Sequence, residues 1–213
     1  MFERVELRAA DLAASLRFYR TVLGVLPIAP TERDADGRAT AWRDFTVLPA
    51  DAVRPATRGL HIGFAAPTRE AVDAFWEAGL RAGHADDGPP GLRPQYAKDY
   101  YGAFLRDPGG NSAEAIHYGE QRDDGAVDHL WIRVADLAAA RAWYAALAPA
   151  AGWRVRDAEP TRVQVERPGR TGSFALVADG AARTEHAQLT VAGADRASAG
   201  ERVDPDGNRV ELT

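Results

Sequence analysis

The feature that most constrains this chain is an internal repeat. Residues 4–19, RVELRAADLAASLRFY, recur 125 positions later (129 − 4) as HLWIRVADLAAARAWY at residues 129–144. In each copy a short apolar run predicts a strand, and the Asp followed by helical spacing predicts an N-cap and a helix. A spacing of 125 residues exceeds the periods of solenoid and propeller repeats. The repeat therefore predicts two tandem copies of one domain.

The two copies also end alike. A turn containing Asp-Pro, Gly and Asn leads into a strand at residues 107–118 and again at residues 204–212. Between the copies, residues 120–125 are polar, charged and bounded by glycine, which is typical of a linker. The predicted organisation is a first domain over residues 1–119, a linker over residues 120–126 and a second domain over residues 127–213.

The second copy is the shorter one. His61 and Glu114 are 53 positions apart, whereas the residues that we align with them, His186 and Glu211, are 25 apart, so 28 residues are missing (53 − 25). In the first copy, the missing part corresponds to a second predicted helix and to a loop rich in Gly and Pro at residues 84–100.

Composition excludes several classes of protein. The net charge is −5 and the Arg residues are spread along the chain, which argues against nucleic acid and anionic membrane surfaces as partners. The chain has no Cys, so a metal would have to bind His, Asp or Glu. The first residues lack an apolar signal core and no run of 18 apolar residues occurs, so we expect a cytoplasmic protein.

Several positions form a recognisable combination: Asp11 with Ser15, Phe18 and Tyr19, His61, residues 92–96, residues 100–104, and residues 107–111 leading to Glu114. In combination, these residues resemble the vicinal-oxygen-chelate superfamily, which includes glyoxalase, bleomycin-resistance proteins, fosfomycin-resistance enzymes and extradiol dioxygenases. The resemblance covers nearly all of residues 1–118 and both ends of residues 126–213.

The resemblance implies an α+β fold in which paired βαβββ modules form half-open curved sheets around a cavity. It would be arranged as two tandem domains with the second shortened. Members typically bind a divalent metal through a His on the first strand of a domain, a His on the fifth and a Glu on the last.

Mapped onto this chain, the second domain offers the full set, His129, His186 and Glu211. Two imidazoles and one carboxylate suit Fe, Mn, Zn or Ni, and they leave positions open for water or for two oxygens of a substrate. The alternative is a metal-free protein in which these residues are relics, because the deletion removes the wall against which a substrate would lean.

The first domain offers Arg4, His61 and Glu114. It differs from the family's set at one position, where Arg4 replaces the His of the first strand. A guanidinium stays protonated and cannot bind a cation. We therefore expect Arg4 to lie near the other two, its charge taking the place of the metal. The resemblance places Arg93 and Tyr101 at the mouth of the cavity, so these five residues predict a pocket for a small, partly aromatic molecule.

Two functions remain open at this point, and a third possibility is that the shortened second domain has become structural and covers the open sheet of the first. The first is a small-molecule-binding protein of the glyoxalase/bleomycin-resistance type, with its pocket in the first domain and a divalent-metal site in the second. The alternative is a metal-dependent lyase, isomerase or dioxygenase acting on a substrate with adjacent oxygens. No acid–base pair can be argued from the sequence, which favours binding. The shortened copy leaves both a monomer and a homodimer open.

Overall fold

The computed structural model describes residues 1–32, 39–119, 126–193 and 198–213, which form three α-helices and 15 β-strands. The first half of the chain contains β1 (Arg4–Ala9), α1 (Leu12–Leu23), β2 (Thr31–Glu32), β3 (Thr40–Trp42), β4 (Phe45–Pro49), β5 (His61–Ala65), α2 (Arg69–Arg81), β6 (Ala85–Leu92), β7 (Tyr101–Arg106) and β8 (Ser112–His117). The second half contains β9 (Val127–Arg133), α3 (Leu137–Ala151), β10 (Arg154–Glu159), β11 (Arg162–Glu166), β12 (Ser173–Val177), β13 (Gln188–Val191), β14 (Gly200–Val203) and β15 (Arg209–Leu212).

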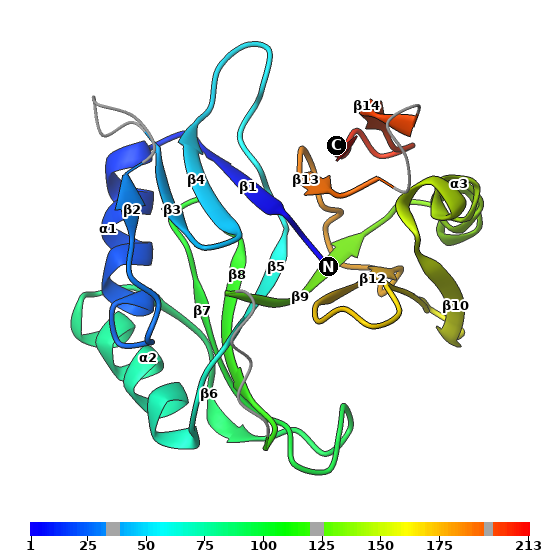
Figure 1. Ribbon diagram of the computed structural model, residues 1–213. Helices are drawn as coiled ribbons and strands as arrows, with labels where there is room; N and C mark the ends of the chain where they lie inside the picture. The colour runs from blue at the N-terminus through cyan, green and yellow to red at the C-terminus, as the bar shows by residue number, and fades with distance from the viewer. Residues whose placement is uncertain (33–38, 120–125, 194–197) are drawn as a thin grey trace.

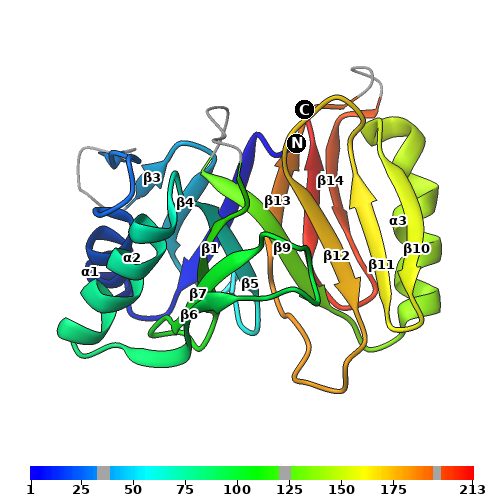
Figure 2. The same ribbon diagram turned by 90° about the horizontal axis from the view of Figure 1, so that it is seen from below.

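The strands form two sheets, and each sheet takes strands from both halves of the chain. One has the order β14-β15-β13-β1-β4-β3-β2, and the other has the order β10-β11-β12-β9-β5-β8-β7-β6. The halves meet where β1 pairs antiparallel with β13 and where β5 pairs antiparallel with β9. We call the two sheets the β1–β13 sheet and the β5–β9 sheet after these junctions. Figure 2 shows β13 and β9 lying next to strands of the first half.

The helices lie at opposite ends of the molecule, with α1 and α2 together at one end and α3 at the other (Figure 1). Both repeated helices begin as predicted. The Asp11 side chain accepts from the Ala14 amide at 2.9 Å, and Asp136 accepts in the same way from the Ala138 and Ala139 amides. Their apolar faces join a single core that includes residues of both halves.

The predicted fold class is confirmed. The described strands and helices repeat the βαβββ order, and the described residues between β13 and β14 contain no counterpart of α2 or β6, so the second copy is the shortened one. Part of the predicted Gly/Pro loop forms β6 instead. This strand lies at the edge of its sheet and has register shifts around Gly88, an arrangement that tolerates proline because an edge strand does not need every amide.

The predicted linker over residues 120–126 lies outside the described residues, except for Ala126. No described helix has both the length and the apolar character that crossing a membrane would require.

Candidate metal centre

Two strands from opposite halves of the chain bring three polar side chains together in the β5–β9 sheet. In the antiparallel ladder, Gly63 of β5 lies opposite His129 of β9. In the parallel ladder on its other side, Gly63 lies opposite Glu114 of β8. Alternate residues of a strand share a face, so His61, Glu114 and His129 all project from the same face of the sheet.

Each of these three side chains offers one ligand atom, and the three ligand atoms lie within 4.8 Å of one another. Nε2 of His61 is 3.0 Å from Oε2 of Glu114 and 3.2 Å from Nε2 of His129. Nε2 of His129 is 3.4 Å from the same Glu114 oxygen. We call these three residues the central cluster. Imidazole nitrogens and carboxylate oxygens bind divalent transition metals, so the central cluster could hold a metal ion.

Each member of the central cluster is oriented by a partner on its remaining polar atom. Nδ1 of His61 is 3.1 Å from the Ser112 hydroxyl, and Nδ1 of His129 is 2.9 Å from Oδ1 of Asp128. The Tyr100 hydroxyl donates to Oε1 of Glu114 at 2.7 Å. Such partners fix the ring orientation and tautomer of metal-binding histidines, and here they leave both Nε2 atoms facing the centre of the cluster.

Burial and charge give the three groups different protonation states. His61 is 6% exposed and Glu114 is 1% exposed. Burial lowers the pKa of His61, which is therefore neutral. Burial alone would raise the pKa of Glu114, but hydrogen bonds from His129 and His61 hold that pKa below its usual value.

His129 behaves differently because two carboxylates face it. Burial would lower the pKa of His129, but hydrogen bonds to Asp128 and Glu114 raise it to about 10. The His129 ring therefore carries a proton at neutral pH. Its positive charge balances the carboxylates of Asp128 and Glu114, as a bound cation would.

Two glycines provide the space that the central cluster occupies. A Cβ on Gly63 would lie 2.4 Å from Cε1 of His129, and a Cβ on Gly102 would lie 2.4 Å from Oε1 of Glu114. These distances are too short for any side chain at either position, so the packing of His129 and Glu114 requires glycine there.

Two cavities open beside the central cluster and share Tyr96, Tyr100 and Trp131 as walls. We call the larger one, of about 320 Å³, the Arg93 cavity. Its lining includes His61, Glu114, Asp87, Arg93, Phe104 and Arg106.

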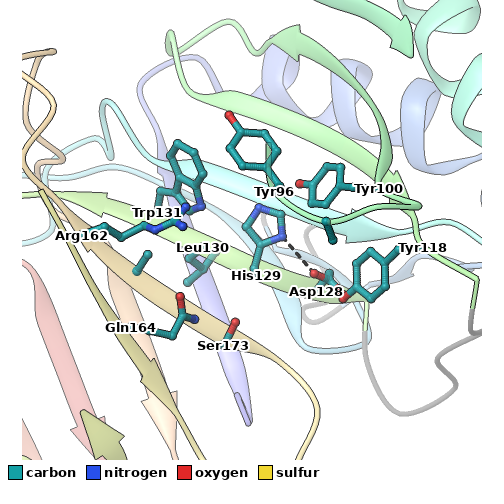
Figure 3. A pocket seen from close by; sticks show the side chains of 12 residues that line it. Tyr96, Tyr100, Tyr118, Asp128, His129, Leu130, Trp131, Arg162, Gln164 and Ser173 are labelled. Atoms are coloured by element: carbon teal, nitrogen blue, oxygen red, sulfur yellow. Dashed lines mark hydrogen bonds and ion pairs between the residues drawn. The ribbon is translucent and has the colours of Figure 1, made fainter. Parts of the chain in front are cut away.

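The second cavity, of about 240 Å³, is the Gln164 cavity. Figure 3 shows the His129 ring within it, between Trp131 on one side and Tyr100 and Tyr118 on the other. Arg162, which lies over the Trp131 ring at 5.9 Å, and Gln164 complete the lining on the side of the second half. Both cavities therefore combine aromatic walls with arginine side chains.

Of the residues predicted to line the pocket of the first domain, the structure brings His61, Glu114 and Arg93 together. Arg93 lies over the Phe104 ring at 5.5 Å. Tyr101 lines neither cavity, because its hydroxyl donates to Asp73 of α2 at 2.8 Å.

Arg4 is not beside His61 and Glu114, because β1 belongs to the other sheet. There the Arg4 guanidinium is 2.7 Å from Glu6 and 3.8 Å from Glu211. The expected contact of Arg4 with the first domain's pocket is therefore not present.

The structure does not bring His129, His186 and Glu211 together, and within the described residues the only group of three suited to a metal is the central cluster. The reason is strand pairing. His129 is on β9, which pairs with β5, whereas Glu211 is on β15, beside β13.

The alignment of His186 with His61 is corrected by two residues. Thr190 lies opposite Glu211 as Gly63 lies opposite Glu114, so Gln188 takes the place of His61. His186 precedes β13 in a bend with φ 59°, and its carbonyl accepts from the Thr57 hydroxyl.

Sequence reasoning assigned no role to Asp128, Tyr100 or Trp131, although each contacts or flanks the central cluster. The signal that was available is the adjacent Asp-His pair at residues 128 and 129. It becomes informative only once the pairing of β9 is known.

Comparison with known proteins agrees with this architecture. The family model described as Glyoxalase/Bleomycin resistance protein/Dioxygenase superfamily matches residues 2–115. The structure of glyoxalase I from Zea mays is 17% identical with a TM-score of 0.65, and the match covers 99% of this chain and 91% of that one. A mutant of the same protein is 16% identical with a TM-score of 0.65, and the match covers 99% of this chain and 92% of that one. At these identities the likeness concerns the fold alone, and it extends over both halves.

A glyoxalase/bleomycin resistance protein from Albidiferax ferrireducens T118 is 35% identical, over 55% of this chain and 98% of its own, with a TM-score of 0.49. No curated protein matches the chain.

Proposed function

The chain belongs to the Glyoxalase/Bleomycin resistance protein/Dioxygenase superfamily, and from this premise we propose that it is a metal-dependent enzyme. Its substrate would be a small molecule with two adjacent oxygens, and its metal would be held by His61, Glu114 and His129. The observation that carries the proposal is the convergence of three ligand atoms within 4.8 Å at the junction of the two halves.

The donor set fits a divalent transition metal. It supplies two imidazole nitrogens and one ionised carboxylate, the combination that suits Fe, Mn, Zn or Ni and leaves coordination positions open. A bound ion of this kind polarises oxygen ligands and stabilises negative charge that develops on them. The cavities on both sides of the central cluster support access of a substrate to those open positions.

Residues of the Arg93 cavity favour an anionic or strongly polar substrate. Arg106 is paired with Asp87 at 2.7 Å, whereas the described residues supply no carboxylate partner for Arg93, which contacts the Leu92 and Pro89 carbonyls and the Phe104 ring. Arg93 is therefore suited to bind a carboxylate of the substrate. Aromatic walls at Tyr96 and Trp131 would hold the apolar part.

Tyr100 would act as a hydrogen-bond donor rather than as a base. Burial, reinforced by the charge of Glu114, raises the pKa of the Tyr100 hydroxyl far above its usual value. The hydroxyl therefore keeps its proton and holds Glu114 in position through the 2.7 Å contact.

The test is metal content compared across matched variants. Purified protein would be loaded with each of Fe(II), Mn(II), Zn and Ni, dialysed, and analysed by mass spectrometry for metal. We expect one ion per chain in the wild type and a loss of stoichiometric binding in His129→Ala, with His186→Ala and Glu211→Gln unchanged. Equal losses in His186→Ala, or no binding by the wild type, would exclude the central cluster as a metal site.

Catalysis is tested separately from metal binding. The loaded protein would be incubated with panels of hydroxycarbonyl compounds and catechols, and products would be followed by mass spectrometry. Turnover that disappears in His129→Ala supports the enzyme.

A second candidate function is sequestration of a small molecule without turnover, favoured by the three tyrosines and Trp131 around the Gln164 cavity. It predicts saturable quenching of tryptophan fluorescence by an aromatic ligand that is recovered unchanged.

A further inference from the structure

The β1–β13 sheet contains a position that corresponds to the central cluster. In the β5–β9 sheet, Gly63 lies opposite both His129 and Glu114. In the β1–β13 sheet, Thr190 lies opposite both Arg4 and Glu211. Arg4 therefore takes the place of His129, Glu211 that of Glu114 and Gln188 that of His61.

This second position opens into a cavity of about 160 Å³. Its charged lining consists of four arginines, Arg4, Arg8, Arg54 and Arg209, and three glutamates, Glu6, Glu201 and Glu211. The net formal charge of the lining is therefore +1 (4 − 3). A guanidinium stays protonated and cannot bind a metal ion. This position therefore has a fixed positive charge at Arg4, where the central cluster has a potential metal ligand.

The glutamates of this cavity are already paired with its arginines. Glu6 lies 2.7 Å from Arg4 and 2.9 Å from Arg8. Glu201 lies 2.5 Å from Arg54 and also contacts Arg209. The carboxylates are thus balanced by cations of the chain and do not require a further one.

The donors of the cavity are not all used. Gln188 is 7% exposed, and its Nε2 has no hydrogen-bond partner among the described residues. Nε of Arg8 is likewise buried and without such a partner. Buried donors are almost always hydrogen-bonded in proteins, so two unused donors in one cationic cavity indicate a ligand that accepts hydrogen bonds.

We propose that this cavity binds a small oxyanion, a carboxylate or a phosphate, through the Gln188 amide and the surrounding guanidinium groups. Guanidinium groups and amide donors recognise both kinds of oxyanion, and the volume admits a ligand of only a few heavy atoms. This inference does not depend on the metal proposed for the central cluster.

The experiment is calorimetric titration of the metal-free full-length protein with inorganic phosphate and, separately, with acetate, at low ionic strength. We expect saturable binding of at least one of the two, and the part of it that depends on Gln188 is the part that belongs to this cavity. Gln188→Met keeps a similar volume but removes the donor, and we expect it to weaken binding about tenfold, as loss of one hydrogen bond to a charged group does. Gln164→Met, in the Gln164 cavity, is the matched control and should bind like the wild type.

Three results would overturn the proposal: no saturable binding of either anion, undiminished binding by Gln188→Met, or an equal loss in the Gln164→Met control. Thermal unfolding of each variant establishes that it is folded. If Gln188→Met does not fold, the half-exposed Arg4 is replaced by Met instead, with the same expected weakening.

Discussion

Asp128 contacts the His129 ring because β9 has a bulge at this point. Successive side chains of a regular strand point to opposite faces, yet Oδ1 of Asp128 lies 2.9 Å from Nδ1 of His129. The ladder pairs Gly63 with His129 and then Phe64 with Val127, so Asp128 is the extra residue. Bulges commonly redirect a side chain next to a functional site, and this one supplies the partner that fixes the tautomer of His129.

Metal binding to the central cluster should release a proton. Hydrogen bonds to Asp128 and Glu114 raise the pKa of His129 to about 10, so near pH 7.5 the ring is protonated, and ligation through Nε2 must displace that proton. The affinity should therefore rise with pH until it levels off near pH 10. Calorimetry in two buffers of different ionisation enthalpy measures the release, which we expect to approach one proton per ion.

Asp128→Asn provides the comparison for this measurement. It removes one of the charges that raise the His129 pKa, so the pH above which proton release declines should be lower than in the wild type. Affinity should fall by about 10- to 100-fold, as is typical when the partner of a metal-binding histidine is lost. Proton release with the same dependence on pH in both proteins would show that His129 is not the group displaced.

Gly63→Ala should disable the metal site with a limited effect on stability. The new Cβ would lie 2.4 Å from Cε1 of His129 and would push that ring out of position. We expect metal affinity to fall more than tenfold, while overpacking costs about 1–3 kcal/mol of unfolding free energy. Ala65→Ser, two residues further along the same strand and not a member of the central cluster, is the control for folding, and retained affinity in Gly63→Ala would contradict the packing argument.

Among the elements, the repeated turn is held to the repeated helix by a buried tyrosine. The Tyr19 hydroxyl of α1 donates to Oδ2 of Asp107 at 3.0 Å. The other oxygen of Asp107 accepts from the Asn111 amide at 2.8 Å, and the Asn111 side chain accepts from the Leu60 amide. One network thus connects α1, the turn before β8 and the start of β5, and so positions the strands that carry Glu114 and His61.

The second half repeats this network with Tyr144, Asp204 and Asn208. The Tyr144 hydroxyl donates to Asp204 at 3.1 Å, and the Asn208 side chain accepts from the amide of Ala187, the residue before β13. The repeated Asp and Asn of the two turns therefore have a structural role that is independent of any ligand.

Tyr19→Phe and Tyr144→Phe should each destabilise the fold by about 1–3 kcal/mol, because each leaves a buried carboxylate with one donor fewer. Urea unfolding at pH 7 measures this, and Tyr96→Phe, at an exposed site, should be neutral.

The loss should also depend on pH. Burial raises the pKa of Asp107 despite its hydrogen bonds, and removing a donor raises it further. In the folded protein, burial then destabilises the ionised form of Asp107. The difference in unfolding free energy between Tyr19→Phe and the wild type should therefore have its full size above the folded pKa of Asp107. It should shrink as the pH falls toward the unfolded value of about 3.9. A difference that does not change with pH would assign the effect to packing.

Local elements were predictable from the sequence, but their partners were not. Alternation over residues 4–9 and the Asp caps depend on neighbouring residues, and they predicted β1, α1 and α3. The pairing of β5 with β9 brings the side chains of His61 and His129 together, although they are 68 positions apart in the sequence (129 − 61). Since both copies have the same pattern, the sequence cannot tell whether a strand pairs within its own half or with the other.

The residues of the site were predictable from the sequence, but their grouping in one cluster was not. His61, Glu114 and His129 were each selected from the sequence, but in two separate sets. The choice of His186 followed the residue type rather than the strand pattern. Leu189 and Val191 are buried as Ile62 and Phe64 are, and matching these apolar positions would have aligned Gln188 with His61.

At the scale of the whole molecule, the two halves are joined by backbone ladders at both junctions rather than by the linker alone. A chain cut at an inserted protease site within residues 120–125 should therefore remain one species in native size-exclusion chromatography and separate only in denaturant. Its metal content should equal that of the uncut chain. Halves that separate without denaturant would contradict this prediction.

Each sheet combines strands from both halves of the chain. The central cluster and the corresponding position at Thr190 therefore each depend on one sheet rather than on one half of the chain. Arg4 lies in the first half of the chain and the short connection after β13 lies in the second half, yet both belong to the β1–β13 sheet. Neither feature lies in the β5–β9 sheet, which contains the central cluster. Features that lie far apart in the sequence can therefore act on the same sheet and leave the central cluster of the other sheet unaffected.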